Sequence, residues 1–381
     1  MRQIGKVLKY ILLTANLCMA GLMLLAAYSP LLQPAHHPWL SSMGLTFPLF
    51  LILNGLFLIF WLIVQQYKLS LLPLLTLLIC YNDIHTLFPL NLWRSEAPEK
   101  HISLLSYNIM AFHGCQKGEE GNPILNYLKT SGADILCLQE YATGRDHKRH
   151  LMQADIDHAL KAYPYHTITA IGEGKRRTNK IACYSKYPII SSRKVDYPSQ
   201  YNGSAIYRIK VDDDTLTVIN NHLESNKLTK EDKVVYEELL SVPEKEKMSS
   251  GIRHLIKKLA EASALRGVQA DSLARRIEAI KGKPIVVCGD FNDIPLSYAY
   301  RQIARCQLTD AFAHSGRGAG ISYNQHHFYF RIDHILTGGG VTSYNCRVDR
   351  SIKTSDHYPI RCDLTLPLRN HPTHQKEKTK S

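Results

Sequence analysis

A carboxylate and an amide, Asp290 and Asn292, follow directly on a short apolar run at residues 285–288. Pro284 and Gly289 bound that run, which predicts a buried strand that stops where the two polar side chains begin. Two residues apart at a strand end, the two side chains lean to one side and can both address one metal-bound water or one phosphate oxygen. An Asx turn, in which both side chains cap the backbone, is the alternative.

Five further short polar stretches carry side chains able to bind a metal ion or to transfer a proton, and most of them follow or end an apolar run. They occupy residues 106–108, 138–140, 220–222, 331–333 and 355–357, which read SYN, LQE, NNH, RID and SDH. Phosphate-ester hydrolysis needs charge neutralisation on a non-bridging oxygen, an activated water and help for the leaving alkoxide. Carboxylate, amide and imidazole groups can supply all three.

This ordered set resembles the endonuclease/exonuclease/phosphatase superfamily, which includes deoxyribonucleases, abasic-site endonucleases, sphingomyelinases and inositol polyphosphate 5-phosphatases. The resemblance covers roughly residues 101–368, and residues 185–188 (SKYP) and the pair Arg266 and Gln269 add to it. It implies an α+β fold, the family's four-layered α/β sandwich, in which two packed β-sheets are flanked by helices.

The resemblance also implies a divalent metal site. Glu140 matches the main metal ligand, Asn108 would lie beside it, and Asp356 is a candidate for a second metal position. Hard oxygen ligands of this kind suit Mg²⁺, with Mn²⁺ as an alternative. The nine cysteines form no CxxC pair and show no zinc-ligand spacing, so a zinc site is not expected.

The catalytic roles implied by the resemblance fall on five residues. Asp290 would orient or deprotonate the attacking water, and Asn292 would hold the phosphate or the nucleophile. His357 matches the family's phosphate-contacting, acid/base histidine, and Asp333 would hydrogen-bond it and fix its tautomer. His222 ends an N-x-H motif and would contact the phosphate or protonate the leaving group.

Two residues are candidates for substrate binding. Asn220 opens the N-x-H motif, and His327 would line the substrate groove. For His327 a surface or packing role is the alternative, because the histidines around it are irregularly spaced.

The elements that must position these side chains alternate along the chain. Residues 101–108 predict a strand, 122–132 a helix and 133–139 a second strand, after which shorter strands follow. Residues 224–283 break this rhythm with charged, helix-favouring sequence, and an insert near 225–253 has no counterpart in the family pattern. The insert is a solvated helix or loop, or a cap over the substrate.

The first 92 residues predict a membrane anchor with about three transmembrane helices, at residues 10–32, 47–64 and 69–90. The third run carries Asn82, Asp83 and His85 near its end. A linker at 93–100 leads to the catalytic domain at 101–368, and residues 369–381 predict a disordered polar tail.

Basic residues predict the orientation of this anchor. Arg2, Lys6 and Lys9 precede the first span and Lys68 lies in the second loop, which favours a cytoplasmic N-terminus. With three spans, the catalytic domain faces the periplasm or cell exterior from a bacterial inner membrane. With two spans it is cytoplasmic.

The formal net charge of +13 belongs mainly to the part of the chain beyond residue 96. Such a balance suits a polyanionic substrate, so we expect a membrane-anchored phosphoesterase with nucleic acid slightly favoured. The alternative substrates are phospholipid, sphingomyelin or phosphoinositide. An inactive membrane-tethered binding module is a remote alternative, because every expected acidic and histidine position is filled. Besides substrate and lipid bilayer, no protein partner is predicted.

Overall fold

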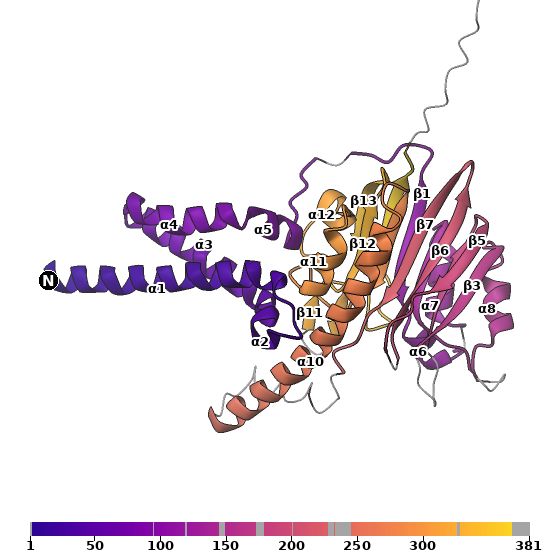
Figure 1. Cartoon of the computed structure of the whole chain (residues 1–381), viewed down its shortest axis with the longest axis horizontal. Helices are drawn as coiled ribbons and strands as arrows, with labels where there is room; N and C mark the ends of the chain where they lie inside the picture. Colours follow the sequence, from indigo (N-terminus) through magenta and orange to yellow (C-terminus); the bar gives the residue numbers. More distant parts are fainter. Residues whose placement is uncertain are drawn as a thin grey trace, which may run out of the picture.

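In a computed structural model of the chain, a helical arm leads into a two-sheet sandwich (Figure 1). The structure describes residues 2–93, 95–118, 120–144, 149–172, 179–199, 201–227, 232, 245–325 and 328–367. The predicted tail at 369–381 and His327 lie outside the described residues.

Each of the two large sheets has six strands. The first has the order β13-β14-β1-β2-β4-β3, and only its central pair, β1 and β2, is parallel. Its strands are β1 (Ile102–Asn108), β2 (Ile135–Tyr141), β3 (Tyr165–Ile171), β4 (Asn179–Ser185), β13 (Thr342–Val348) and β14 (Ile360–Thr365).

The second sheet has the order β5-β6-β7-β8-β12-β9, and again one central pair, β7 and β8, is parallel. Its strands are β5 (Ile189–Lys194), β6 (Gly203–Val211), β7 (Asp214–His222), β8 (Ile285–Asp290), β9 (Thr309–Asp310) and β12 (Asp333–Gly338). A separate small sheet pairs β10 (Tyr323–Gln325) with β11 (Phe328–Phe330).

The two large sheets pack face to face over a continuous apolar core. Leu104 and Ile135 of the first sheet belong to the same buried cluster as Val218 and Val286 of the second. Central strands are covered on both faces, so every residue of β1 and β8 is buried, and β8 begins with an unbroken apolar run instead of an alternating pattern.

Helices cover both outer faces and complete the four layers. The first sheet is covered by α6 (Met110–Cys115), α7 (Pro123–Thr130) and α8 (Gln153–Ala159), and the second by α10 (Lys245–Glu278) and α11 (Tyr298–Ala304). Helix α12 (Ala311–Ser315) instead contacts β12 of the second sheet and β13 of the first, and its Ala311 and Phe312 belong to the core between the sheets. Helix α7 begins where the Asn122 side chain accepts a hydrogen bond from Leu125 N, with Pro123 in the first turn. The α+β sandwich expected from the sequence is therefore confirmed.

Helix α10 is a single helix of 34 residues. It includes residues 245–253 of the predicted insert and continues past Arg266 and Gln269. Residues 228–231 and 233–244 lie outside the described part of the chain, so a capping role for the insert stays a prediction.

Residues 2–87, the helical arm, consist of α1 (Arg2–Tyr28), η1 (Ser29–Leu31), α2 (Pro38–Ser41), η2 (Ser42–Thr46), α3 (Phe47–Ile63), α4 (Tyr67–Ile79) and α5 (Tyr81–Leu87). Two stretches, Gly5–Leu31 and Pro38–Ile63, are long and apolar enough to cross a membrane. The third predicted run is bent by 59° between α4 and α5, and it reaches that length only if the pair forms one span.

The inner end of the helical arm is packed on the sandwich. Met23 and Phe47 of the arm share an apolar cluster with Ile294 and Leu296, which follow β8. The fit is close, because a Cβ added to Gly44 would lie 2.0 Å from the carbonyl oxygen of Leu296. The arm is therefore part of the surroundings of the strand that ends at Asp290.

A second contact joins the arm to the sandwich at α5. The guanidinium of Arg331 donates to the carbonyl of Thr86 and, at 2.8 Å, to the carboxylate of Asp310. The helical arm and the sandwich each provide a hydrogen-bond acceptor for this buried guanidinium. The two contacts hold α5 against the sandwich after the bend between α4 and α5.

Candidate active site

The polar strand ends predicted from the sequence converge at one edge of the sandwich. The parallel pair β1 and β2 ends with Asn108 and Glu140, and the parallel pair β7 and β8 ends with His222 directly opposite Asp290. Asp333 opens β12, where it is also the register partner of Asp290. Because parallel strands deliver their carboxyl ends to one edge, residues far apart in sequence meet here.

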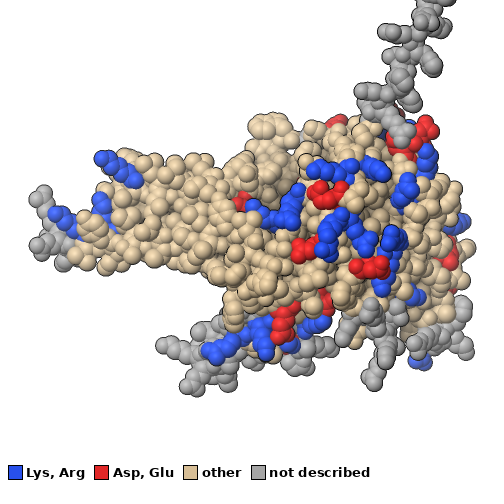
Figure 2. Space-filling view, viewed as in Figure 1, with Lys and Arg blue, Asp and Glu red and all other residues tan. Residues whose placement is uncertain are grey.

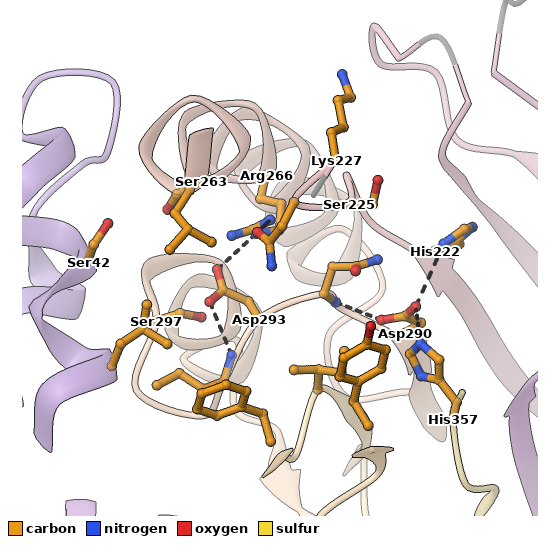
Figure 3. A pocket seen from close by; sticks show the side chains of 18 of the residues that line it. Ser42, His222, Ser225, Lys227, Ser263, Arg266, Asp290, Asp293, Ser297 and His357 are labelled. Atoms are coloured by element: carbon orange, nitrogen blue, oxygen red, sulfur yellow. Dashed lines mark hydrogen bonds and ion pairs between the residues drawn. The ribbon is translucent and has the colours of Figure 1, made fainter. Parts of the chain in front are cut away.

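Asp290 is the centre of this group and its side chain is 1% exposed. Its Oδ2 accepts a hydrogen bond from Asn108 Nδ2 at 3.0 Å and lies 3.6 Å from His357 Nε2 and 3.7 Å from His222 Nε2. Figure 3 shows this carboxylate between the two imidazoles, with His222 above it and His357 below. Its Oδ1 accepts from the backbone N–H of Asn292 at 2.8 Å.

That last bond is the Asx turn that the sequence left open as the alternative. It uses only Oδ1, so Oδ2 of Asp290 still faces the histidines. Asn292 itself has a positive φ of 52° and donates from Nδ2 to the carbonyl of Leu223 at 3.0 Å. The Asx turn and the contacts of Asp290 with the two histidines can therefore form together, because they use different oxygens of the Asp290 carboxylate.

Asp333 holds His357 in place. Oδ2 of Asp333 lies 2.8 Å from Nδ1 of His357, which leaves Nε2 of the ring directed at Asp290. Burial alone would lower the pKa of His357, but the carboxylates of Asp333 and Asp290 raise it well above its ordinary value. Burial raises the pKa of Asp290. The pair formed by Asp290 and His357 therefore retains a proton more readily than either group does in water.

Glu140, at the end of β2, faces the same space from the first sheet. Its backbone has a positive φ of 52°, next to a register shift between Leu138 and Tyr141. The side chain is 40% exposed and its Oε1 accepts from Asn108 Nδ2 at 3.2 Å. Asn108 thus bridges the carboxylates of Glu140 and Asp290.

The donor set fits a hard divalent cation. Oxygen ligands are available from Asn108, Glu140, Asp290 and Asp356, three of which line one cavity. Asp290, Asp333 and His357 also offer ligand atoms within 4.8 Å of one another. The imidazole of that second set is already hydrogen-bonded to Asp333, so the oxygen set is the better fit for a hard divalent cation.

Asn220 does not join this group. It is fully buried, its Oδ1 accepts from Gln139 Nε2 at 2.7 Å, and its Nδ2 donates to the carbonyls of Leu138 and Ala182. These bonds tie the two sheets together beneath the site. Asn220 is absent from the described lining of the cavity, and a role in substrate binding stays a prediction.

Tyr323 and Ser355 contribute to the site without having been singled out from the sequence. The ring of Tyr323 packs edge-on against His357, with centroids 5.1 Å apart. The hydroxyl of Ser355 donates to the carbonyl of Asn108 at 2.7 Å and accepts from the backbone N–H of His357. Ser355 lies in the SDH stretch, but no local pattern marks Tyr323.

A cavity of about 400 Å³ opens beside these residues. One end, the candidate catalytic end, is lined by Glu140, His222, Asp290, Asn292, Asp356 and His357. Its opposite end is lined by Ser41, Ser42 and Leu45 of the helical arm. In Figure 3, Ser42 faces the cavity from the side opposite His222 and His357.

Residues 105–357 match the model of the Endonuclease/Exonuclease/phosphatase family. The chain belongs to this family. Its members hydrolyse phosphoester bonds and generally use divalent metal ions, and the matched residues include every polar strand end described above. Residues 9–87 match a domain of unknown function (DUF8431), which corresponds to the helical arm. No curated protein matches the chain significantly.

Several solved structures are similar to part of the chain. An endonuclease/exonuclease/phosphatase from Beutenbergia cavernae DSM 12333 is 16% identical, with a TM-score of 0.49 over 70% of this chain and 72% of that one. A family protein from Bacteroides thetaiotaomicron is 14% identical, with a TM-score of 0.47 over 72% and 98%. The human Nocturnin catalytic domain with bound sulfate is 15% identical, with a TM-score of 0.47 over 70% and 95%.

Proposed function

We propose that this protein is a membrane-anchored phosphoesterase that hydrolyses phosphodiester bonds with the help of Mg²⁺ or Mn²⁺. The observation that carries the proposal is the buried Asp290 carboxylate, whose Oδ2 lies within 3.7 Å of two imidazoles and beside an open cavity. A buried carboxylate between two proton carriers is suited to activating water for attack on a phosphate ester.

In this reaction the oxygen of a water molecule attacks phosphorus, and the ester P–O bond on the opposite side breaks. Asp290 orients the water and accepts its proton. His357, held by Asp333, contacts a phosphate oxygen. Asn292, in the Asx turn that follows β8, also binds the phosphate. His222 donates a proton to the leaving oxygen, so the products are a phosphate monoester and an alcohol.

Glu140 and Asp356 would hold the cation, with Asn108 orienting Glu140 or binding through its amide oxygen. When bound, the cation neutralises charge on a non-bridging phosphate oxygen. Asp290 and Glu140 carry like charges near one another, which is a further reason to expect a cation between the two sheets.

The helical arm supports membrane anchoring with the catalytic domain on the side opposite the N-terminus. Lys9 Nζ donates to Gln66 Oε1 at 2.7 Å, so the start of α1 lies beside the turn between α3 and α4. Basic side chains gather at this outer end (Figure 2). The positive-inside rule then puts the catalytic domain outside the cytoplasm, in the periplasm of a bacterium, with α4 and α5 as a bent third span.

Two substrate classes remain for this activity. Nucleic acid rests on the net charge of +13, although basic and acidic side chains are interspersed on the face of the sandwich seen in Figure 2. Phospholipid-type substrates are favoured by one specific observation, namely that residues of the helical arm line the cavity that contains Asp290.

The test of the proposed activity is hydrolysis of bis(p-nitrophenyl) phosphate by the full-length protein in detergent. We expect turnover with Mg²⁺ or Mn²⁺, none with EDTA, and a loss of about 10²-fold or more in Asp290→Ala. Asp157→Ala is the matched control, because it removes a 40% exposed carboxylate on α8 that is not among the described residues lining the cavity. Equal rates in the presence of EDTA, or in Asp290→Ala, would refute the proposal.

A further inference from the structure

The cavity has two chemically different ends. The catalytic end carries carboxylates and imidazoles, whereas the end toward the helical arm is lined mainly by apolar side chains. These are Leu45, Ile294, Leu296, Phe330 and Ile332, which belong to or pack against the apolar cluster that joins the arm to the sandwich. Such a polarity matches a ligand with a phosphate at one end and an apolar portion at the other.

The serines of the arm do not make this end polar. The hydroxyls of Ser41 and Ser42 both donate to the carbonyl of Pro38, at 3.2 and 3.0 Å. Their hydroxyl protons are therefore directed at the arm's own backbone. What the arm presents to the cavity is the apolar side chain of Leu45 together with small Ser side chains.

The cationic side chains of the described cavity lining, Arg266 and Lys227, are already paired. Arg266 Nε lies 2.9 Å from Asp293 Oδ2, and Lys227 Nζ lies 2.7 Å from Glu224 Oε1. Figure 3 shows the Arg266 pair lying between the two ends of the cavity. A polyanion that followed the cavity would have to compete with both carboxylates for these cations.

Ser41, Ser42 and Leu45 form the wall of the cavity that the helical arm contributes. This wall lies where a membrane surface is expected. The wall lies between α1 and α3, and Trp39 and Leu40, 55% and 46% exposed, directly precede Ser41. Along α1, the exposed rings of Tyr10 and Tyr28 are about 27 Å apart at helical rise, close to the ~30 Å thickness of a hydrocarbon core. Aromatic side chains favour the two interfaces of a bilayer, so the wall is expected at the interface nearest the catalytic domain.

We propose that the substrate is a lipid phosphoester, taken from the leaflet on the side of the catalytic domain. Its phosphate lies at Asp290, and the apolar portion next to the phosphate packs against Leu45 and Leu296 while the rest of the chain stays in the bilayer. This inference rests on the proposed phosphoesterase activity and deepens it. The helical arm is then a wall of the substrate site as well as an anchor.

The test uses the full-length protein reconstituted in mixed vesicles of phosphatidylethanolamine, phosphatidylglycerol and sphingomyelin, with Mg²⁺. Release of phosphorylated head groups or of free head-group alcohols is measured in parallel with hydrolysis of bis(p-nitrophenyl) phosphate and nicking of plasmid DNA. Leu45→Trp fills the apolar end of the cavity. Leu49→Trp is the matched control, since Leu49 is 56% exposed on α3, one turn away.

We expect lipid turnover, and a ratio of lipid to bis(p-nitrophenyl) phosphate turnover that falls about tenfold in Leu45→Trp and stays unchanged in Leu49→Trp. Leu45→Ala, which removes apolar contact without overpacking, should lower the same ratio in the same direction. Thermal unfolding of each variant checks that it is folded.

Other outcomes separate this inference from the activity on which it rests. DNA nicking without lipid turnover, or an unchanged ratio in both Leu45 variants, would overturn the lipid inference while leaving a phosphoesterase. Absence of turnover with all three substrates would overturn the proposed activity, and the lipid inference with it.

Discussion

The side chains of Asp333 and His357 are hydrogen-bonded, with Oδ2 of Asp333 2.8 Å from Nδ1 of His357, and both are almost fully buried. The backbone N–H of Asp333 in turn donates to the hydroxyl of Ser322 at 3.0 Å, and that of His357 donates to Ser355. These bonds fix the ring with Nε2 toward Asp290. The contact between His357 and a phosphate oxygen that we propose therefore depends on Asp333.

Asp333→Asn tests this dependence. The amide keeps the shape of the side chain but removes the negative charge and offers an N–H to the ring, which favours the wrong tautomer. We expect kcat for bis(p-nitrophenyl) phosphate to fall about 10²-fold or more, with KM little changed. A variant with wild-type kcat would show that the contact is only structural, provided that circular dichroism confirms folding.

Glu140→Gln tests the metal site. The amide keeps the hydrogen-bonding distance to Asn108 but removes the charge that attracts a cation. We expect the Mg²⁺ concentration for half-maximal activity to rise about 10-fold or more. Mn²⁺ binding followed by electron paramagnetic resonance gives a readout independent of turnover. Unaltered Mn²⁺ affinity would argue against Glu140 as a ligand.

Gly44→Ala tests the contact between the helical arm and the loop after β8. Its Cβ would lie 2.0 Å from the Leu296 carbonyl oxygen, so one of the two backbones must move. We expect a destabilisation of about 1–3 kcal/mol, seen as a lower unfolding midpoint of the full-length protein in detergent. Gly55→Ala is the control, because nothing lies within 4 Å of its Cβ. Equal midpoints for the two variants would contradict the close packing.

Asp310→Asn tests the buried ion pair that also holds α5. Burial acts to raise the pKa of Asp310, but the guanidinium of Arg331 and the hydroxyl of Tyr300 hold it below its ordinary value. The stabilisation is therefore fully present above the unfolded-state pKa of about 3.9 and is lost as the pH falls through the lower folded-state value.

At pH 7 we expect Asp310→Asn to lower the stability of the full-length protein by about 3 kcal/mol, because Arg331 is left buried without its counter-charge. Below pH 4 the difference in unfolding free energy between wild type and Asp310→Asn should become smaller. Denaturant titrations at the two pH values measure it. A difference that stays constant or widens in acid would contradict the pairing.

The strand ends of the site could be predicted from the sequence because each of them is a local pattern. Asp290, Glu140 and His222 follow apolar, β-branched runs, and the parallel pairs that such runs form bring their carboxyl ends to one edge. The surroundings of Asn220 could not be predicted, because its partners Leu138 and Ala182 come from the facing sheet.

The second half of the cavity depends on packing between distant parts of the chain. Leu45 and Leu296 are separated by about 250 residues, and no periodicity in either segment indicates that they meet. The bend between α4 and α5 likewise depends on a contact between distant parts of the chain. The segment predicted as the third span extends through this bend, but Arg331 donates to the carbonyl of Thr86 and holds α5 against the sandwich.

The central claim, attack of water on phosphorus at Asp290, is tested most directly by isotope incorporation. The full-length protein with Mg²⁺ is allowed to hydrolyse bis(p-nitrophenyl) phosphate in H₂¹⁸O, and the products are analysed by mass spectrometry. We expect one ¹⁸O in p-nitrophenyl phosphate, none in p-nitrophenol, and no product above background with Asp290→Ala. Two results would contradict the account: ¹⁸O in p-nitrophenol, or ¹⁸O-labelled p-nitrophenyl phosphate formed by Asp290→Ala at the wild-type rate.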